Sequence, residues 1–407
     1  MKNKYRELIN KYGSPLYVYD EDILKDRCKR MIEFKEDLEN DLNGILVNLH
    51  YSIKANSNPS LLKIIKESCL CVDSMSPFEL DICKKSGFNN NEILYVCNNV
   101  TKEEIKFIHD NNILVCLDSI SQVISWGELF PNTNIMVRIN PGVTGVGHSD
   151  KVVTAGKDTK FGITKENINL LLEEVTKYNL NIIGIHQHLG SLFLNDKIDE
   201  YIDGVKAGLK IVEEYFPNIS IVDLGGGFGV PYKEDEKDLD LLEVSRKLKE
   251  VLIPFINKMP SIKELKFEPG RFIPCESGII AGTVTATKYE NDTYWIGTDI
   301  GMNELVRPSM YGAYHKIETL TDNNKEVTSN ICGNICESGD MLGKDRKVLF
   351  PNVDDIILVY NAGAYGYSMA SNYTGRCRPA EVLISNNEDK LIRNRETIED
   401  IENNIIW

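Results

Sequence analysis

The chain has 407 residues, of which 42% are hydrophobic and 26% are charged, as expected for a folded globular protein. This length exceeds what one compact core usually holds, so two domains are expected. The formal net charge is −15 and the basic residues form no stripe, which argues against nucleic acid as a partner. The first residues are charged rather than an apolar signal core, and no apolar run is long enough to cross a membrane. We therefore expect a cytoplasmic protein without a membrane partner.

The cysteines are scattered along the chain, and none forms the two-residue-gap pair that is typical of structural zinc. Since no secretion signal is evident, we expect reduced core cysteines and no metal site. The ten positions are Cys28, Cys69, Cys71, Cys83, Cys97, Cys116, Cys275, Cys332, Cys336 and Cys377.

The first 30 residues contain one alternating strand at 16–19, after which Asp20 is expected to cap a helix that runs to Arg30. Apolar strand-like segments then recur at 45–53, 69–72, 92–96, 113–117, 134–139, 181–188, 220–224 and 262–267. Helical patterns lie between several of them, at 77–85, 102–111, 165–178 and 197–215. This rhythm predicts an α/β fold, a (β/α)8 TIM-like barrel over residues 31–280, with its active site at the carboxyl ends of the strands.

The pattern changes from about residue 279 onward. Segments 283–289, 294–299, 347–350 and 355–359 alternate with period two, and no helical pattern follows them. This is typical of antiparallel sheet and predicts a second, C-terminal β domain made of residues 1–30 and 281–407. Residues 16–19 are a candidate strand of that domain, and 386–404 are expected to form a polar tail or a helix.

Lys54 follows the first apolar strand of the predicted barrel, and Asn56, Asn58 and Pro59 after it end that strand. A lysine at the carboxyl end of a buried strand is partly desolvated, which lowers the pKa of its amine and makes it a nucleophile. Such a lysine suits an imine with an aldehyde cofactor. The alternative is an ordinary surface lysine.

The sixth predicted strand carries His186 and His188, which alternation places on one face. Two histidines at that spacing can bind a metal, but no acidic partner is near in the sequence, so zinc is a minor option. We expect one to be a structural histidine. The other, beside Gly190 and Ser191 at the barrel mouth, is expected to lie flat against an aromatic cofactor, and His188 is nearer that mouth.

The seventh and eighth predicted strands end in two further motifs. Gly225, Gly226 and Gly227 expose backbone N–H groups that suit a phosphate, although a flexible turn is the alternative. Glu268 projects from the eighth strand end, where a carboxylate can hold a pyridine nitrogen protonated. Arg271 can pair with a phosphate or a carboxylate, and a surface Glu–Arg turn is the alternative.

Three stretches of the second domain combine reactive side chains with glycines or a strand end. They are Arg307 to Tyr311, Cys336 to Asp340, and the glycine-rich turn that contains Tyr365. An exposed tyrosine in such a turn can donate a hydrogen bond to a phosphate, and core packing is the alternative.

These stretches, in this order and over roughly residues 12 to 385, resemble the fold-type III pyridoxal-phosphate decarboxylases, and among them the diaminopimelate decarboxylases. The resemblance implies that Lys54 carries pyridoxal 5'-phosphate, that His188 stacks on its ring, and that Glu268 faces its pyridine nitrogen. It implies that the phosphate is held by Ser191, Gly225, Gly226, Gly227, Arg271 and Tyr365.

The same resemblance implies a substrate site and a dimer. Arg271, Arg307, Tyr311, Glu337 and Tyr365 would bind the substrate, and Cys336 would be the proton donor. In this family the active site forms across a homodimer interface, so residues 1–30 and 281–407 would complete the site of the partner subunit.

The implied reaction converts meso-2,6-diaminopimelate to L-lysine and carbon dioxide, the last step of lysine biosynthesis. Racemases of this fold place an arginine against the ring nitrogen, so Glu268 favours decarboxylation. Decarboxylases of other basic amino acids, such as ornithine or lysine and their D-forms, would not need Arg307. A non-catalytic regulator would lack cofactor contacts that this chain keeps.

The sequence departs from the family pattern in three places, all expected near the mouth of the barrel. They are Ser76-Pro77-Phe78-Glu79, Leu192 after Ser191, and Asn372-Tyr373-Thr374. The sequence therefore supports the identity of the substrate with fewer matching residues than the identity of the cofactor.

Overall fold

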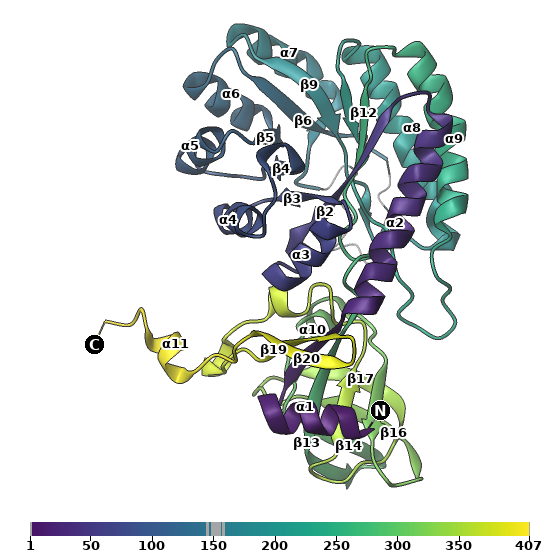
Figure 1. Cartoon of the computed structure of the whole chain (residues 1–407), viewed down its shortest axis with the longest axis vertical. Coiled ribbons are helices and arrows are strands. Elements are labelled where there is room, and N and C mark those ends of the chain that lie inside the picture. The colour runs from purple at the N-terminus through teal and green to yellow at the C-terminus, as the bar shows by residue number, and fades with distance from the viewer. Residues whose placement is uncertain (1, 144–145, 148–155, 157–158, 407) are drawn as a thin grey trace. The chain divides into compact units, whose positions relative to one another are not determined.

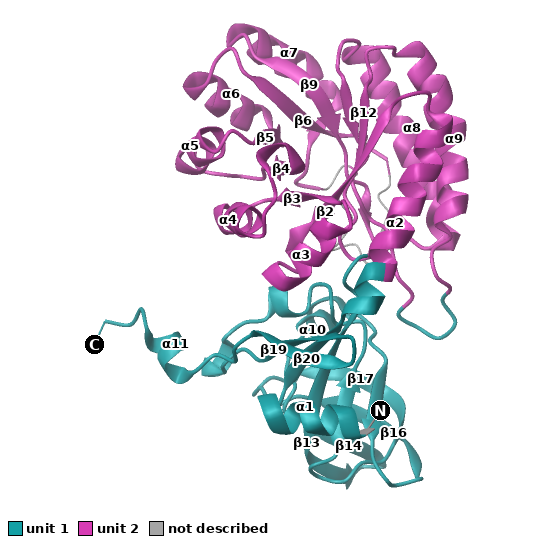
Figure 2. Cartoon of the chain, viewed as in Figure 1, with its two compact units in different colours: residues 1–25, 232–236, 273–407 teal, residues 26–231, 237–272 magenta. Residues whose placement is uncertain are grey.

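The computed structural model describes residues 2–143, 146–147, 156 and 159–406, and it divides into two compact units (Figure 2). The sheet unit comprises residues 1–25, 232–236 and 273–407, and the barrel unit comprises residues 26–231 and 237–272. The ranges expected from the sequence are 1–30 with 281–407, and 31–280. The observed boundaries lie close to these, but residues 232–236 belong to the sheet unit although their chain neighbours belong to the barrel unit.

Eight parallel strands close into a barrel in the described part of the barrel unit, as predicted. β2 pairs with β3 on one side and with β12 on the other, and pairing between β5 and β6 closes the ring. The strands are β2 (Leu46–Ser52), β3 (Cys71–Ser74), β4 (Ile93–Val96), β5 (Leu114–Leu117), β6 (Asn134–Asn140), β9 (Asn181–His186), β11 (Ile221–Asp223) and β12 (Glu264–Phe267).

Helices cover the outside of these strands, as Figure 1 shows. Most of those that follow a strand begin with a side chain that accepts a hydrogen bond from the first helical turn, such as Asn58 from Ser60 N at 2.9 Å and Asp240 from Glu243 N at 3.0 Å. The helices are α2 (Glu21–Asp41), α3 (Pro59–Glu67), α4 (Pro77–Lys85), α5 (Lys102–Asp110), α6 (Ile120–Leu129), α7 (Ile168–Lys177), α8 (Ile198–Tyr215) and α9 (Leu241–Lys258).

Strand register decides which polar residues meet at the barrel mouth. Asp223 ends β11 and lies opposite His186, the last residue of β9, while Glu268 directly follows β12. Apolar residues such as Leu94 and Met136 fill the barrel elsewhere. Because parallel strands are buried on both faces, their sequences are nearly continuous apolar runs, and polar residues stand out at the strand ends.

The sheet unit contains a nine-stranded sheet, and that sheet is mixed rather than purely antiparallel. β1 runs parallel to β19, and β14 runs parallel to β16, whereas its other pairs are antiparallel. Alternation in a sequence does not specify strand direction, which explains this correction. The strands are β1 (Leu16–Asp20), β13 (Gly278–Glu290), β14 (Thr293–Thr298), β15 (Ile317–Leu320), β16 (Glu326–Cys332), β17 (Met341–Leu349), β18 (Ile356–Val359), β19 (Ala380–Ser385) and β20 (Glu388–Arg393).

Two terminal predictions need adjustment. Asp20 does cap α2 by accepting from Asp22 N at 3.0 Å and Ile23 N at 3.1 Å, but the helix continues past Arg30 to Asp41. Residues 386–404, expected as a polar tail or a helix, contain the short helix α11 (Ile398–Glu402) and also the strand β20, which was not expected. The sheet unit also holds α1 (Lys2–Tyr12) and α10 (Arg307–Tyr311). Among the described residues, we find no helix with the length and apolarity needed to cross a membrane.

Candidate active site

Lys54 lies in a single helical turn, Ile53–Ala55, that directly follows β2 at the carboxyl end of the barrel. Its neighbours Ile53 and Ala55 are buried, and Lys54 itself is half-buried. The Tyr51 hydroxyl donates to the Asn56 carbonyl at 2.9 Å, which holds the turn closed. The backbone therefore places Lys54 at the barrel mouth, where the sequence predicted it, and its role as cofactor lysine stays a prediction.

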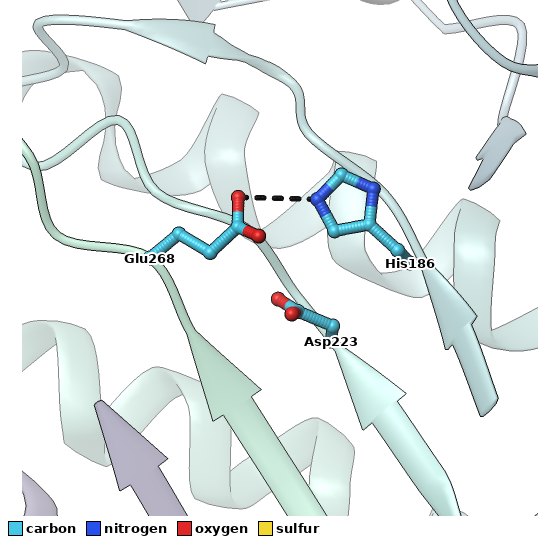
Figure 3. Close-up of side chains that lie close together, drawn as sticks. All are labelled: His186, Asp223 and Glu268. Carbon is cyan, nitrogen blue, oxygen red and sulfur yellow. Dashed lines mark hydrogen bonds and ion pairs between the residues drawn. The ribbon is translucent and has the colours of Figure 1, made fainter. Parts of the chain in front are cut away.

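His186 and Glu268 form a buried pair at the strand ends (Figure 3). The His186 Nε2 atom lies 3.1 Å from Glu268 Oε2, and the two residues are only 1% and 4% exposed. The other carboxylate oxygen, Oε1, has no hydrogen-bond partner among the described residues. His186, expected as a structural histidine, thus binds the carboxylate expected to face the cofactor.

The charge of Glu268 is set by its neighbours. Burial alone raises the pKa of a carboxyl, but the charge of His186 and its hydrogen bond, together with the Lys54 charge, hold the pKa of Glu268 below its usual range. Glu268 is therefore an ionised carboxylate in an almost dry site.

Asp223 completes this cluster and behaves in the opposite way. Its Oδ1 accepts from Gly225 N at 2.9 Å, and its Oδ2 has no partner among the described residues. Burial, followed by the charge of Glu268, raises the pKa of Asp223 well above its usual value. His186, Asp223 and Glu268 offer ligand atoms within 4.8 Å of one another, so acidic groups that are distant in the sequence lie beside His186. The expectation of no metal site stays a prediction.

His188 lies two residues beyond the end of β9, so the strand alternation expected from the sequence does not extend to it. It is half-buried, and its Nδ1 accepts a hydrogen bond from Gly226 N at 3.0 Å. Burial and the nearby Lys54 charge lower the pKa of His188, which keeps the ring neutral. The two histidines therefore have separate hydrogen-bond partners, His186 with Glu268 and His188 with Gly226.

The glycine loop after β11 has no room for side chains. A Cβ on Gly226 would lie 2.0 Å from the Glu268 carbonyl oxygen, and one on Gly225, where φ is +70°, would lie 2.4 Å from the Gln187 carbonyl oxygen. Beside this loop is the predicted phosphate contact Ser191, whose Oγ accepts from Arg271 Nη2 at 3.2 Å. A serine hydroxyl, a guanidinium and a glycine backbone are brought into one region of the barrel unit.

Two polar residues of the barrel interior were missed in the sequence. Arg138 on β6 places its Nη1 atom 3.8 Å from Asp118 Oδ2, and its Cζ atom lies 4.5 Å from the centroid of the Phe161 ring. Burial lowers the pKa of the Arg138 guanidinium. Asp73 on β3 accepts a hydrogen bond from the Ser52 hydroxyl. Burial, followed by the charge of Glu268, raises the pKa of Asp73 to about 8. Charged residues inside or directly after apolar strands are the signal that could have identified both.

Arg307 begins α10 in the sheet unit and is 1% exposed. Its Nη1 donates to the Tyr232 hydroxyl at 3.0 Å and lies 2.9 Å from His315 Nε2. His315 Nδ1 lies 2.8 Å from the Tyr360 carbonyl, which can only accept, so Nδ1 carries the proton and Nε2 accepts from Arg307. Arg307 is thus fixed by a neutral histidine. Tyr311, at the other end of the helix, is half-buried.

The segment Cys336 to Asp340 forms a tight loop after β16. Asp340 holds it by accepting from Met302 N at 2.6 Å and from Ile335 N at 2.7 Å. Cys336 and Glu337 are exposed, and the Tyr373 hydroxyl donates to Glu337 Oε1. Tyr373 itself matches the family pattern, and the departure in this stretch is at the next residue, Thr374.

Tyr365 occupies the left-handed region with a φ of 55° and is half-buried. A bulky residue rarely adopts this conformation, and such strain is found mostly at functional positions.

The two units divide the predicted site residues into two sets. Those in the barrel unit are Lys54, His188, Ser191, Gly225, Gly226, Gly227, Glu268 and Arg271, and those in the sheet unit are Arg307, Tyr311, Cys336, Glu337 and Tyr365.

The barrel set fits the cofactor implied by the resemblance. The buried, unpartnered Oε1 of ionised Glu268 is an acceptor for a protonated ring nitrogen. The side-chain-free loop of Gly225, Gly226 and Gly227 allows a phosphate to approach the backbone. Lys54 adds an amine at the same end of the barrel.

Comparison with known proteins indicates the same cofactor. The family model described as "Pyridoxal-dependent decarboxylase, pyridoxal binding domain" matches residues 26–275. The diaminopimelate decarboxylase of Methanothermobacter thermautotrophicus is 32% identical over 97% of this chain and 92% of its own. That of Methanocaldococcus jannaschii is 34% identical over 97% of this chain and 92% of its own.

Solved structures agree with these relatives. The M. jannaschii diaminopimelate decarboxylase in complex with L-lysine superposes with a TM-score of 0.89 at 32% identity, over 98% of this chain and 94% of that one. A further diaminopimelate decarboxylase structure gives a TM-score of 0.90 at 27% identity, over 99% of this chain and 96% of that one.

Proposed function

Because this chain belongs to the pyridoxal-dependent decarboxylases, we propose that it removes one carboxyl group from meso-2,6-diaminopimelate and releases L-lysine and carbon dioxide. The observation that carries this proposal is the similarity, over 97% of the chain, to relatives named diaminopimelate decarboxylase. The complex of one such relative with L-lysine supports it, since lysine is the product of that reaction.

Bound pyridoxal phosphate supplies an electron sink for the bond that breaks. Lys54 is the amine that would hold its aldehyde. Glu268 is the ionised carboxylate that would keep the ring nitrogen protonated through Oε1, and His188 would lie against the ring. Ser191 and Arg271 would hold the phosphate.

Four further backbone and side-chain groups complete the proposed cofactor contacts. The N–H groups of Gly225, Gly226 and Gly227 would bind the phosphate, and Tyr365 would donate to it and lie beside the substrate. Their support is the absence of side chains in the glycine loop and the left-handed backbone of Tyr365.

The substrate has a second amino-acid end that carries one carboxylate and one ammonium. Arg307 and Arg271 would bind a carboxylate, and Tyr311 would contact the chain between the two ends. Glu337 would accept from the distal ammonium. Arg307 is buried and is held by the neutral His315, which supports its role in binding a carboxylate. A guanidinium that is already fixed loses little conformational entropy when the substrate binds.

Cys336 would return a proton to the carbon that loses the carboxyl group. We propose that it does so in the active site of a second copy, so that the protein acts as a homodimer. The exposure of Cys336 and Glu337 on one loop supports this assignment. The ten free cysteines agree with a reducing compartment, and we propose that the protein works in the cytoplasm.

Carbon dioxide release from a panel of amino acids tests the function. We expect meso-diaminopimelate to be turned over much faster than either enantiomer of lysine or ornithine, or than arginine. Faster turnover of ornithine or lysine would identify a decarboxylase of simpler basic amino acids. Lys54→Ala serves as the inactive reference and is expected to abolish turnover.

A second substrate separates the two distal contacts. 2-Aminopimelate has the distal carboxylate but lacks the distal ammonium. Glu337→Gln is expected to lower kcat/KM for diaminopimelate and to change that for 2-aminopimelate little. An equal loss with both substrates would assign Glu337 another role.

A further inference from the structure

The pair of His186 and Glu268 has a defined direction of hydrogen bonding. An ionised carboxylate can only accept, so the His186 Nε2 atom carries the proton in their 3.1 Å contact. The other ring nitrogen, Nδ1, is buried and has no partner among the described residues. Within the described protein, the imidazole thus makes one directed bond, and that bond ends on Glu268 Oε2.

Asp223 and Glu268 are two neighbouring carboxyl groups, and the ionisation of one makes the ionisation of the other less favourable. Asp223 and Glu268 both offer oxygens within 4.8 Å of each other and of His186, and both are buried (Figure 3). Carboxylates this close in a dry site do not both ionise readily. Asp223 has the hydrogen bond from Gly225 N, whereas Glu268 has the imidazole. The contact with His186 is therefore what makes the surroundings of the Glu268 carboxylate differ from those of the Asp223 carboxyl group.

We propose that His186 is a positioning residue, which directs the negative charge of the strand-end cluster onto Glu268 and turns Oε1 toward the cofactor's ring nitrogen. Asp223 keeps its proton in this arrangement. The inference rests on the proposed role of Glu268, and it holds whichever amino acid is decarboxylated.

Other charged groups face Glu268 and would remain when His186 is replaced. Lys54 and Arg138 are the nearby charged basic groups, His188 and His50 are nearby neutral imidazoles, and Asp73 and Asp223 are the nearby acids. The charged basic groups favour ionised Glu268, but the donor that contacts its carboxylate among the described residues is His186. Loss of His186 would therefore weaken the charge on Glu268 and leave its carboxylate plane unfixed.

The test follows the protonation of the cofactor directly. Holoenzyme is prepared with pyridoxal phosphate labelled with ¹⁵N in the ring, and the ring-nitrogen chemical shift is recorded against pH. His186→Phe keeps a flat ring without a donor, and His186→Gln keeps a weaker, neutral donor. His50→Phe is the matched control, since His50 is a buried barrel histidine whose Nε2 lies 2.9 Å from Lys266.

We expect the ring nitrogen of His186→Phe to lose its proton at a pH lower by about one unit or more than in the parent protein, with cofactor affinity weakened about tenfold. His186→Gln is expected to fall between the two, and His50→Phe to keep the parent profile. A parent profile in His186→Phe overturns the proposal. If that variant does not fold, a parent profile in His186→Gln overturns it instead.

Glu268→Gln separates the inference from its premise. If Glu268→Gln leaves the ring nitrogen protonated as in the parent, the proposed role of Glu268 fails, and the inference fails with it. If Glu268→Gln shifts the profile and neither His186 variant does, only the role of His186 is overturned.

Discussion

Arg307 provides the sharpest test of the proposed substrate contact, because its position depends on a neutral histidine. His315→Phe keeps the ring shape and its edge contact with Tyr232, whose ring centroid lies 5.2 Å away. It removes the acceptor 2.9 Å from Arg307 Nη1 and the donor 2.8 Å from the Tyr360 carbonyl. The guanidinium keeps its bond to the Tyr232 hydroxyl but loses the acceptor that fixes the direction of Nη1.

The expected effect follows from the lost hydrogen bond. A hydrogen bond to a charged group contributes about 1.5–3 kcal/mol, and 1.4 kcal/mol corresponds to a factor of ten. We therefore expect the KM for diaminopimelate to rise roughly tenfold to hundredfold, with a smaller change in kcat, if Arg307 binds a substrate carboxylate. A residue that only stabilised the fold would lower the melting temperature without this separation of KM from kcat.

A double-mutant cycle makes the measurement decisive. In Arg307→Met the guanidinium is already lost, so adding His315→Phe is expected to change KM little further. His109→Phe is the control, since His109 lies on the surface of the barrel unit, stacked on Phe130. Additive effects of Arg307→Met and His315→Phe, or an unchanged KM in His315→Phe, would refute the assignment.

Further predictions concern the glycine loop, the Glu337 contact and a buried acid. Gly226→Ala places a Cβ 2.0 Å from the Glu268 carbonyl oxygen, so we expect about 1–3 kcal/mol of strain. A fluorescence titration is expected to show clearly weaker cofactor binding. Gly297→Ala is the tolerated control, because the atom nearest to its added Cβ is 3.5 Å away. Tyr373→Phe frees Glu337 from its hydroxyl donor and is expected to raise the KM for diaminopimelate a fewfold but not that for 2-aminopimelate. Burial raises the pKa of Glu304 to about 7, so this acid retains its proton in the folded state while the unfolded state loses it. Its contribution to the free energy of unfolding is therefore expected to fall by about 3 kcal/mol as pH rises from about 4.5 to 7, and urea titrations of Glu304→Gln are expected to lack that slope.

The barrel could be predicted because its strands are buried on both faces. Apolar runs alternating with helical patterns gave eight strand positions, and the rule that active sites lie at the carboxyl ends singled out Lys54 and Glu268. The second sheet was less predictable. β1 and β19 are parallel neighbours although they are far apart in the sequence, and no local pattern specifies such a pairing.

The finer arrangement of the site depends on register, which alternation alone does not reveal. His186 and Glu268 are 82 positions apart, and they meet because β9, β11 and β12 are adjacent in the barrel. The choice between His186 and His188 depended on where β9 ends. Likewise, Tyr373 contacts Glu337 only because two loops of the sheet unit come together.

The strand-end cluster of His186, Asp223 and Glu268 buries polar atoms without partners in the described part of the chain, whereas much of the barrel interior follows the rule that buried positions are apolar. Each buried polar atom without a partner lowers stability by about 1–3 kcal/mol, and His186 Nδ1, Asp223 Oδ2 and Glu268 Oε1 are three such atoms among the described residues. A barrel selected for stability alone would have apolar residues there, as it has Leu94 and Met136 elsewhere. A protonated ring nitrogen would satisfy Glu268 Oε1, so part of this instability would be relieved when the cofactor binds. Cofactor binding should therefore raise the melting temperature more in the parent protein than in Glu268→Gln.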